Sequence, residues 1–270
     1  MCRVLGCVAR TPVSLRHELV EAPNPMIRQS EHHDSGWGMA VYPHGDGEDP
    51  AVVRFPNAAH ADGSFLDATD KHGRIFNVHV RRATMGGLTP ENTHPFTLGS
   101  YSFCHNGTIL HFSRLLEPGV MEPAGETDSE HFFNLLMRDF DDGNVVGSLR
   151  RAVTFAIGSS PFSGLNFLFS DGDRLYAYKL GGFDLHWLIR RDQTLVASER
   201  VTDESWHSVQ DDVLITLDPE SPEDIHCERL VGDGVLASAT IEKYKDGSEL
   251  RGRERGDFAA DRAARLAAGE

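Results

Sequence analysis

The chain has 270 residues, of which 40% are hydrophobic and 25% charged, and these fractions are ordinary for a globular protein that buries its own core. The 41 acidic side chains outnumber the 26 basic ones, and the formal net charge of -15 disfavours nucleic acid as a partner because it would repel a phosphate backbone. No apolar run approaches the roughly 20 residues of a membrane span, which excludes a membrane protein.

The N-terminal segment predicts a protein that is not exported. It contains Arg3 and Arg10, and it lacks the continuous apolar stretch and the cleavage site of a signal peptide. The four cysteines of the chain are too few and too scattered for a disulfide framework, and no CxxC pair suggests structural zinc. We therefore expect a cytoplasmic location and reduced thiols.

The first half of the chain is predicted to be rich in strands. Short apolar runs bounded by turn residues occur at 2–9, 36–42, 51–55, 74–82 and 99–104. Within the fourth run, Asn77, His79 and Arg81 share one face, because successive side chains of a strand point to opposite sides. One face of this strand is therefore polar, as a site would need.

Helices are predicted in the middle of the chain and strands again after it. Thr127 and Glu130 have the spacing of a capping box, which predicts a helix that begins there and buries one apolar stripe. A second helix is predicted from about 145 to 157. Later strands are predicted within 165–180, around an Asp-Gly-Asp turn, and within 186–191, 194–200, 211–218 and 225–230.

No repeat or linker divides the chain, which favours one domain of two sheets flanked by helices. We expect this domain to span residues 1–245. Residues 246–270 are charged and Ala-rich, and they are predicted to form a C-terminal helix or tail without a site.

Cys2 is the first candidate for chemistry. Removal of Met1 would leave one residue that carries both a thiol, with an ordinary pKa of about 8.5, and a free α-amine, with an ordinary pKa of about 7.7 to 8.0. The amine could then accept the thiol proton near neutral pH, directly or through one water. The alternative interpretation is an ordinary buried strand residue.

Three further segments each allow two interpretations. Arg81 offers a planar fork for a carboxylate, or it is a solvated charge at a strand end. Asn106 and Gly107 could form an oxyanion hole from a side-chain amide and a backbone N–H, or a hairpin turn. Asp128 could pair with a substrate ammonium, or it favours the helix start as a cap next to the macrodipole.

Six segments in the same order and spacing resemble the class II glutamine amidotransferases over the first half of the chain. They are Met1–Arg3, Asp34–Gly38, His79–Gly86, Asn92–Phe96, His105–Gly107 and Gly125–Glu130. The resemblance is closest to stand-alone members that consist of this domain alone, including the γ-glutamyl hydrolase of ergothioneine biosynthesis. It implies an α+β fold, a four-layer αββα Ntn-hydrolase sandwich of two mainly antiparallel sheets flanked by helices.

The resemblance also implies roles for the residues in these segments. Cys2, N-terminal after removal of Met1, would be the nucleophile. Arg81 would bind the α-carboxylate of glutamine, and Asp128 its α-ammonium. The remaining candidates are Asn106 and Gly107 for the oxyanion, and Thr84 and His79 for support of the bound substrate. No metal or cofactor is implied, and the segment 32–34 resembles a metal cluster only in composition.

The implied reaction is cleavage of the γ-amide of glutamine or of a γ-glutamyl amide through a γ-glutamyl thioester. One alternative is a glutaminase subunit that delivers ammonia to a separate synthase partner, and another is a non-catalytic binding protein on the same scaffold. No phosphate- or nucleotide-binding motif follows residue 200, so the acceptor is left open. Specificity beyond the γ-glutamyl group is expected to depend on loops such as 43–50, 57–72 and 112–126.

Overall fold

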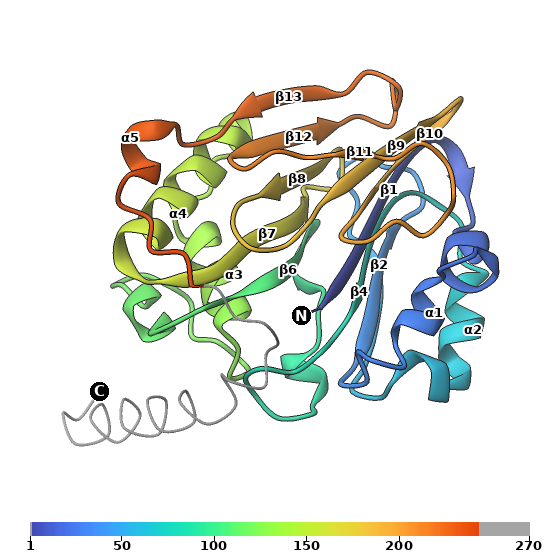
Figure 1. Ribbon diagram of the computed structural model, residues 1–270, viewed down its shortest axis with the longest axis horizontal. Helices are drawn as coiled ribbons and strands as arrows, with labels where there is room; N and C mark the ends of the chain where they lie inside the picture. Colours follow the sequence, from blue (N-terminus) through green and yellow to red (C-terminus); the bar gives the residue numbers. More distant parts are fainter. Residues whose placement is uncertain (1, 243–270) are drawn as a thin grey trace.

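The computed structural model describes residues 2–242, and it consists of two antiparallel sheets that face each other, with helices on the outer face of each (Figure 1). Within these residues, the first sheet has the strand order β11-β9-β10-β1-β4-β2-β3 and the second β13-β12-β8-β7-β6-β5. The strands of the first sheet are β1 (Arg3–Val13), β2 (Trp37–Tyr42), β3 (Ala51–Phe55), β4 (Gly73–Val80), β9 (His186–Arg190), β10 (Gln193–Ala197) and β11 (His207–Ser208). Those of the second are β5 (Phe96–Leu98), β6 (Tyr101–Ile109), β7 (Phe162–Ser170), β8 (Leu175–Lys179), β12 (Val213–Leu217) and β13 (His226–Arg229).

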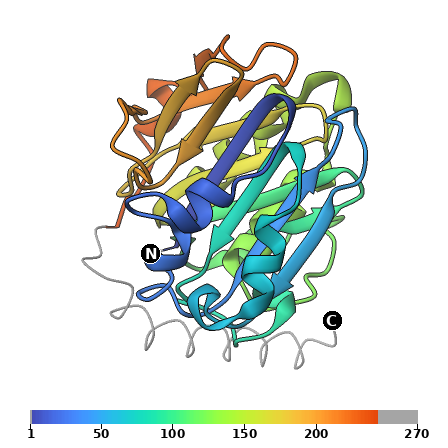
Figure 2. The same ribbon diagram turned by 90° about the vertical axis from the view of Figure 1, so that its right-hand side faces the viewer.

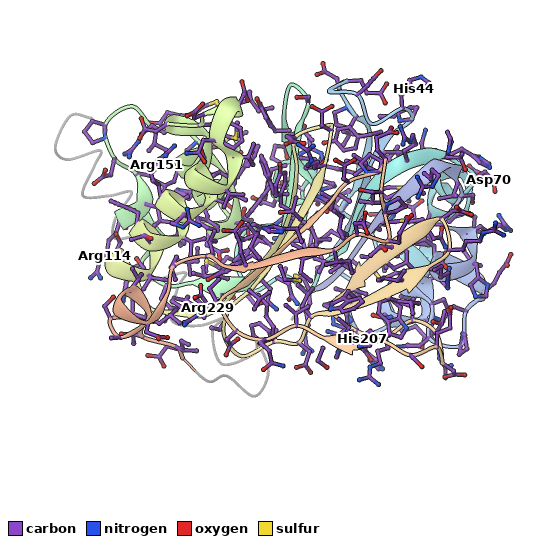
Figure 3. All side chains as sticks on the ribbon, turned by 90° about the horizontal axis from the view of Figure 1, so that it is seen from above. His44, Asp70, Arg114, Arg151, His207 and Arg229 are labelled. Atoms are coloured by element: carbon purple, nitrogen blue, oxygen red, sulfur yellow. The ribbon has the colours of Figure 1, made fainter. Side chains whose placement is uncertain are left out.

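Helices cover both outer faces and complete the four layers. The described helices are α1 (Met26–Gln29), α2 (Gly63–Thr69), α3 (Asp128–Arg138), α4 (Val145–Ser159) and α5 (Asp233–Leu236). α1 and α2 lie on the first sheet (Figure 2), and α3 and α4 lie on the second. Seen from above, Arg114 and Arg151 mark the side of α3 and α4, and Asp70 marks the opposite side, with the sheets between them (Figure 3).

The alternation of side chains along β1 explains why the chain forms layers. Leu5 and Cys7 are buried against the residues under α1 and α2, whereas Val4 and Val8 are buried between the two sheets. Because successive side chains of a strand point to opposite faces, a strand buried on both sides needs apolar residues at nearly every position. The predicted αββα arrangement is confirmed.

The helix next to the site begins where the sequence predicts it, but its cap differs in one detail. The Thr127 side chain accepts a hydrogen bond from the backbone N–H of Glu130 at 3.2 Å, as an N-cap does. The Glu130 carboxylate, however, accepts from the backbone N–H groups of Ala124 and Gly125 at 2.8 and 2.7 Å. It therefore fixes the loop before the helix.

The second predicted helix is confirmed as α4, and its apolar stripe is buried. Leu149, Val153 and Ile157 are each at most 3% exposed, as their spacing of one turn predicts. The segment 57–72 was expected to be a loop, and this was wrong, because α2 lies within it and Asp62 accepts a hydrogen bond from Ser64 as its N-cap.

The predicted tail, 246–270, lies outside the described residues. Among residues 2–242, none of the helices has the length and apolarity needed to cross a membrane.

Candidate active site

Cys2 directly precedes β1, whose first residue, Arg3, pairs with Val80 at the end of β4. Its half-buried Sγ accepts a hydrogen bond from the backbone N–H of Arg82 at 3.4 Å and donates one to the Arg82 carbonyl oxygen at 3.6 Å. Burial raises the pKa of the thiol above its ordinary value. A base is therefore needed to ionise this thiol near neutral pH.

Arg81 is buried beside Cys2, and its guanidinium holds the following loop. Its Nη1 donates to the Gly87 carbonyl at 2.9 Å, and its Nη2 donates to the Met85 carbonyl at 2.6 Å. A guanidinium has five N–H groups, so these two bonds leave others for a ligand. Burial lowers the pKa of Arg81, while the nearby charges of Cys2 and Asp128 act in the opposite direction.

Asp128 is buried at the first position of α3 and faces β6. Its Oδ2 accepts a hydrogen bond from the backbone N–H of Ile109 at 2.8 Å. Thr127 is the N-cap residue, and Asp128 lies in the first turn of α3, where a carboxylate is favourable next to the helix macrodipole, as the alternative interpretation expects. Burial raises the pKa of the Asp128 carboxyl to about 7, although the hydrogen bond from Ile109 and the charge of Arg81 oppose this shift.

His105 lies 3.8 Å from Asp128, and its ring is neutral near pH 7 because burial lowers its pKa to about 4. Its Nε2 lies 3.1 Å from the Gly164 carbonyl oxygen, which can only accept, so Nε2 carries the hydrogen. Nδ1 then accepts from the Ser129 hydroxyl at 2.9 Å. His105 thus ties β6, β7 and α3 together without forming an ion pair with Asp128.

The charges of three predicted site residues converge at this point of the fold. Arg81 and Asp128 both influence the pKa of Cys2, and Cys2 and Asp128 both influence the pKa of Arg81. The thiol, the guanidinium and the carboxylate are therefore neighbours, although they come from the start of β1, the end of β4 and the start of α3. This arrangement places a cation and an anion beside one nucleophile.

Asn106 and Gly107 lie within β6, not in a turn. Asn106 is paired with Asn166 of β7, and Gly107 with Leu165, so the hairpin interpretation was wrong. The Oδ1 atom of Asn106 is buried and hydrogen bonds no residue in the described part of the chain. Cys104, two positions earlier on the same face of β6, feels the charge of Cys2. Asn106 therefore shares the face of β6 that is turned toward Cys2.

Gly107 occupies a position where only glycine fits. A Cβ atom there would overlap the carbonyl oxygen of Gly164 and approach Nε2 of His105 to 2.6 Å. We expect Gly107→Ala to force β6 and β7 apart and to lower the free energy of unfolding by about 1 to 3 kcal/mol, the usual cost of overpacking. Thermal unfolding followed by circular dichroism measures this loss.

A matched control for this substitution is Gly158→Ala. Gly158 lies in α4, and nothing approaches its Cβ position within 4 Å. Because alanine has the higher helix propensity, the control should raise stability by about 0.5 to 1 kcal/mol. Equal melting temperatures for the two variants would contradict the close contact of β6 and β7 at Gly107.

Thr84 and His79 are placed differently from each other. Thr84 is half-buried, and its hydroxyl lies 3.4 Å from that of Thr108 on β6. His79 is buried between the sheets, and its ring is tilted by 32° against that of His94 at a centroid distance of 4.1 Å. Burial lowers the pKa of His79 to about 3, although a contact of the ring with the backbone of His105 opposes this shift. For both residues, support of a bound substrate stays a prediction.

Several contributors to the site were not assigned a role from the sequence. They are the backbone of Arg82, the carbonyl of Gly164 and the side chains of His105 and Ser129. Arg82, His105 and Ser129 lie within the motif segments, which is the only signal that could have indicated them, and Gly164 lies outside these segments. Across residues 2–242, no three His, Cys, Asp or Glu side chains are grouped so as to hold a metal ion.

Comparison with known proteins identifies the family of the chain. The family model of the class II glutamine amidotransferases matches residues 1–194. The Escherichia coli strain K12 protein YafJ, named only provisionally as a glutamine amidotransferase, is 27% identical over 233 residues, which cover 80% of this chain and 89% of YafJ.

Solved structures of low sequence identity share the fold. A glutamine aminotransferase class-II domain protein from Silicibacter pomeroyi has a TM-score of 0.61 at 20% identity and covers 86% of this chain and 100% of its own. The glutamine phosphoribosylpyrophosphate amidotransferase of Bacillus subtilis, an Ntn hydrolase, has a TM-score of 0.66 at 17% identity and covers 86% of this chain and 50% of its own. With the two-sheet sandwich and the match over residues 1–194, the chain belongs to the class II glutamine amidotransferase family.

Proposed function

We propose that the protein hydrolyses the γ-amide of glutamine or of a γ-glutamyl amide, with Cys2 as an N-terminal nucleophile after removal of Met1. The observation that carries this proposal is the convergence of Cys2, Arg81 and Asp128, whose charges act on one another. A γ-glutamyl group has one carboxylate and one ammonium on its α-carbon, which two methylene groups join to the amide carbon. Arg81 and Asp128 match these two charges beside a thiol.

The proposed reaction begins with proton transfer from the Cys2 thiol to the α-amine of the same residue. The thiolate then attacks the γ-carbonyl carbon, and the carbonyl oxygen becomes an oxyanion that the Asn106 amide and the Gly107 N–H stabilise. Collapse of this intermediate breaks the C–N bond, and the amine leaves with the proton held by the α-amine. Water then hydrolyses the thioester, which releases glutamate and restores the thiol.

The raised pKa of the Cys2 thiol supports the need for a base at this position. A buried thiol with a raised pKa is protonated at pH 7, and its own α-amine, with an ordinary pKa of about 7.7 to 8.0, is the nearest group that could accept the proton. An uncleaved N-terminal extension should therefore abolish activity, because an acylated nitrogen has no basic lone pair.

The proposed function is tested by glutamate release from the purified protein, given glutamine and a set of γ-glutamyl amides. We expect turnover of at least one of them without added metal or partner. Absence of glutamate from every substrate would contradict the proposal. If the thiol still reacted with a glutamine-like diazoketone in that case, an ammonia-donor subunit that requires a synthase would replace it.

Asp128→Asn is expected to weaken substrate binding while leaving the fold intact. Asparagine keeps an oxygen that can accept from Ile109, but it removes the charge that pairs with the ammonium. Loss of a hydrogen bond to a charged group predicts a decrease in kcat/KM of about 10- to 100-fold, mostly through KM. Steady-state kinetics with glutamine, together with thermal unfolding of the same samples, measures both effects.

The same carboxyl gives the wild-type enzyme a pH dependence. Its pKa of about 7 in the free protein means that it is protonated below pH 7, where it cannot pair with an ammonium. Activity as kcat/KM should therefore rise through pH 7. Of the ionisable side chains that face this carboxyl, Arg81 opposes the raised pKa, and the His105 ring, 3.8 Å away, is neutral in this range.

The same carboxyl also affects the stability of the fold. Because burial raises its pKa to about 7, the carboxyl becomes a buried charge as pH rises from about 4 to 7, and the folded protein becomes less stable over this range. Asp128→Asn removes this charge, so the variant should not have a lower melting temperature than the wild type at pH 8. An unchanged KM in this variant would count against ammonium binding by Asp128.

A further inference from the structure

Arg82 has a charge that no residue of the described chain neutralises. Its backbone holds the Cys2 sulfur, and its side chain is half-buried, yet the guanidinium forms no hydrogen bond or ion pair within residues 2–242. The neighbouring guanidinium groups are occupied: Arg3 pairs with Glu199 at 2.5 Å, and Arg81 holds two carbonyl oxygens of its loop. The guanidinium of Arg82 is therefore available to bind an anion from outside the chain.

The backbone at the end of β4 determines on which side of Cys2 this cation lies. The Arg81 N–H donates to the Gly36 carbonyl at 2.7 Å, and the Arg81 carbonyl accepts from Ser35 at 2.9 Å, so residue 81 continues the ladder of β4. Successive side chains of an extended chain point to opposite faces. Because Arg81 lies on the face of Asp128, Arg82 is directed to the other side.

His33 marks that other side. It is buried after α1, and burial is the main cause that lowers its pKa to about 4, with the charges of Arg3 and Arg82 adding to the effect. Its Nδ1 lies 2.7 Å from the Gln29 carbonyl and carries the ring hydrogen, because a carbonyl can only accept. The His33 ring, which is neutral near pH 7, therefore lies on the side to which Arg82 is directed and does not neutralise its charge.

The two sides of Cys2 correspond to the two sides of the scissile amide. If Arg81 and Asp128 hold the γ-glutamyl carboxylate and ammonium, the amine portion of the substrate extends from the γ-carbonyl in the opposite direction, toward Arg82. Free ammonia has no negative charge to offer there, whereas an amino acid has a carboxylate that a guanidinium binds with two parallel hydrogen bonds.

We propose that the preferred substrates are γ-glutamyl amides whose amine portion carries a carboxylate, as in γ-glutamyl amino acids and peptides, and that Arg82 binds this carboxylate. The inference rests on the proposed hydrolase function. The reaction balances without a further reagent: the C–N bond breaks as the C–S bond forms, the thiol proton leaves on the amino acid, and water then hydrolyses the thioester to glutamate.

The experiment compares γ-glutamylglycine with γ-glutamyl ethylamide, which are similar in size and differ in the carboxylate. Glutamate release is measured with the wild type, Arg82→Met and Arg82→Lys. We expect the wild type to prefer γ-glutamylglycine at least about tenfold in kcat/KM, as one charge-assisted contact predicts. Arg82→Met should remove this preference by raising KM for γ-glutamylglycine alone, and Arg82→Lys should restore part of it.

A matched control for the change in charge is Arg191→Met. Arg191 is 95% exposed in the turn after β9, so this variant loses the same charge far from any buried group. It should keep the wild-type preference. An equal loss for both substrates in Arg82→Met, or a wild type that releases glutamate from glutamine and both amides without preference, would overturn the inference and leave the hydrolase function standing. Release from none of the three substrates would overturn both.

Discussion

Cys2→Ala is expected to reduce glutamate release by on the order of 10⁶-fold, the loss typical of removing a catalytic nucleophile. The variant should fold normally, because the thiol is half-buried and makes only two weak contacts with the backbone of Arg82. Steady-state turnover of glutamine and γ-glutamyl amides measures the loss, and a thermal melt of the same sample shows that the fold is retained.

The other cysteines are the controls for this result. Cys227 is exposed, and Cys7 is buried on the face of β1 that is turned toward α1 and α2. Cys227→Ala and Cys7→Ala should keep turnover, although the second removes a buried sulfur and lowers stability slightly. Retained turnover in Cys2→Ala, or its loss in Cys227→Ala, would assign the chemistry to another group.

Asn106→Ala is expected to lower kcat by about 100- to 1000-fold, or about 2.7 to 4 kcal/mol of transition-state stabilisation, with little change in KM. An oxyanion exists only during the reaction, so its donor contributes little to binding of the ground state. Since the buried Oδ1 of Asn106 has no partner among the described residues, its removal leaves no broken hydrogen bond behind. Single-turnover kinetics separates the rate from binding.

Substitution of Asn166, the cross-strand neighbour of Asn106, should have the opposite effect, on stability instead of on kcat. Its side chain is a structural bridge, because Nδ2 donates to the Phe183 carbonyl at 2.9 Å and Oδ1 accepts from the Leu180 N–H at 3.0 Å. Asn166→Ala should therefore lower the melting temperature and change kcat much less. If Asn106→Ala lost only stability and kept its kcat, the amide would be structural and the oxyanion would need another donor.

Much of the fold could be predicted from local patterns, because burial repeats along each element. In β4, the alternation of apolar and polar residues indicated a strand with one apolar and one polar face, and the spacing of Leu149, Val153 and Ile157 indicated α4. α2 was missed because Asp62 and Gly63, which cap and begin it, are also typical of a turn.

The site shows what a local pattern cannot provide. Asn-Gly is typical of a hairpin turn, but pairing with β7, which follows more than 50 residues later, keeps these residues inside a strand. Arg81 and Arg82 are adjacent and chemically identical in the sequence. Only the pairing of residue 81 with Ser35 and Gly36 determines which of them lies toward Asp128.

The burial that positions the site also tunes its groups. Burial raises the pKa of Cys2 and of Asp128 and lowers that of Arg81, so each charged form is less stable in the empty site than in water. A γ-glutamyl substrate brings the complementary charges for Arg81 and Asp128. The substrate therefore gains binding energy from Arg81 and Asp128, whose charged forms are destabilised by burial in the free protein.

The most direct test of the central claim is the covalent labelling of Cys2. The purified protein is incubated with a glutamine-like diazoketone, and intact-mass measurement is followed by peptide mapping. We expect a chain without Met1 that carries one adduct on Cys2, and no adduct in the Cys2→Ala variant. A protein that keeps Met1 and still turns over substrate, or an adduct on a different residue, would contradict the claim.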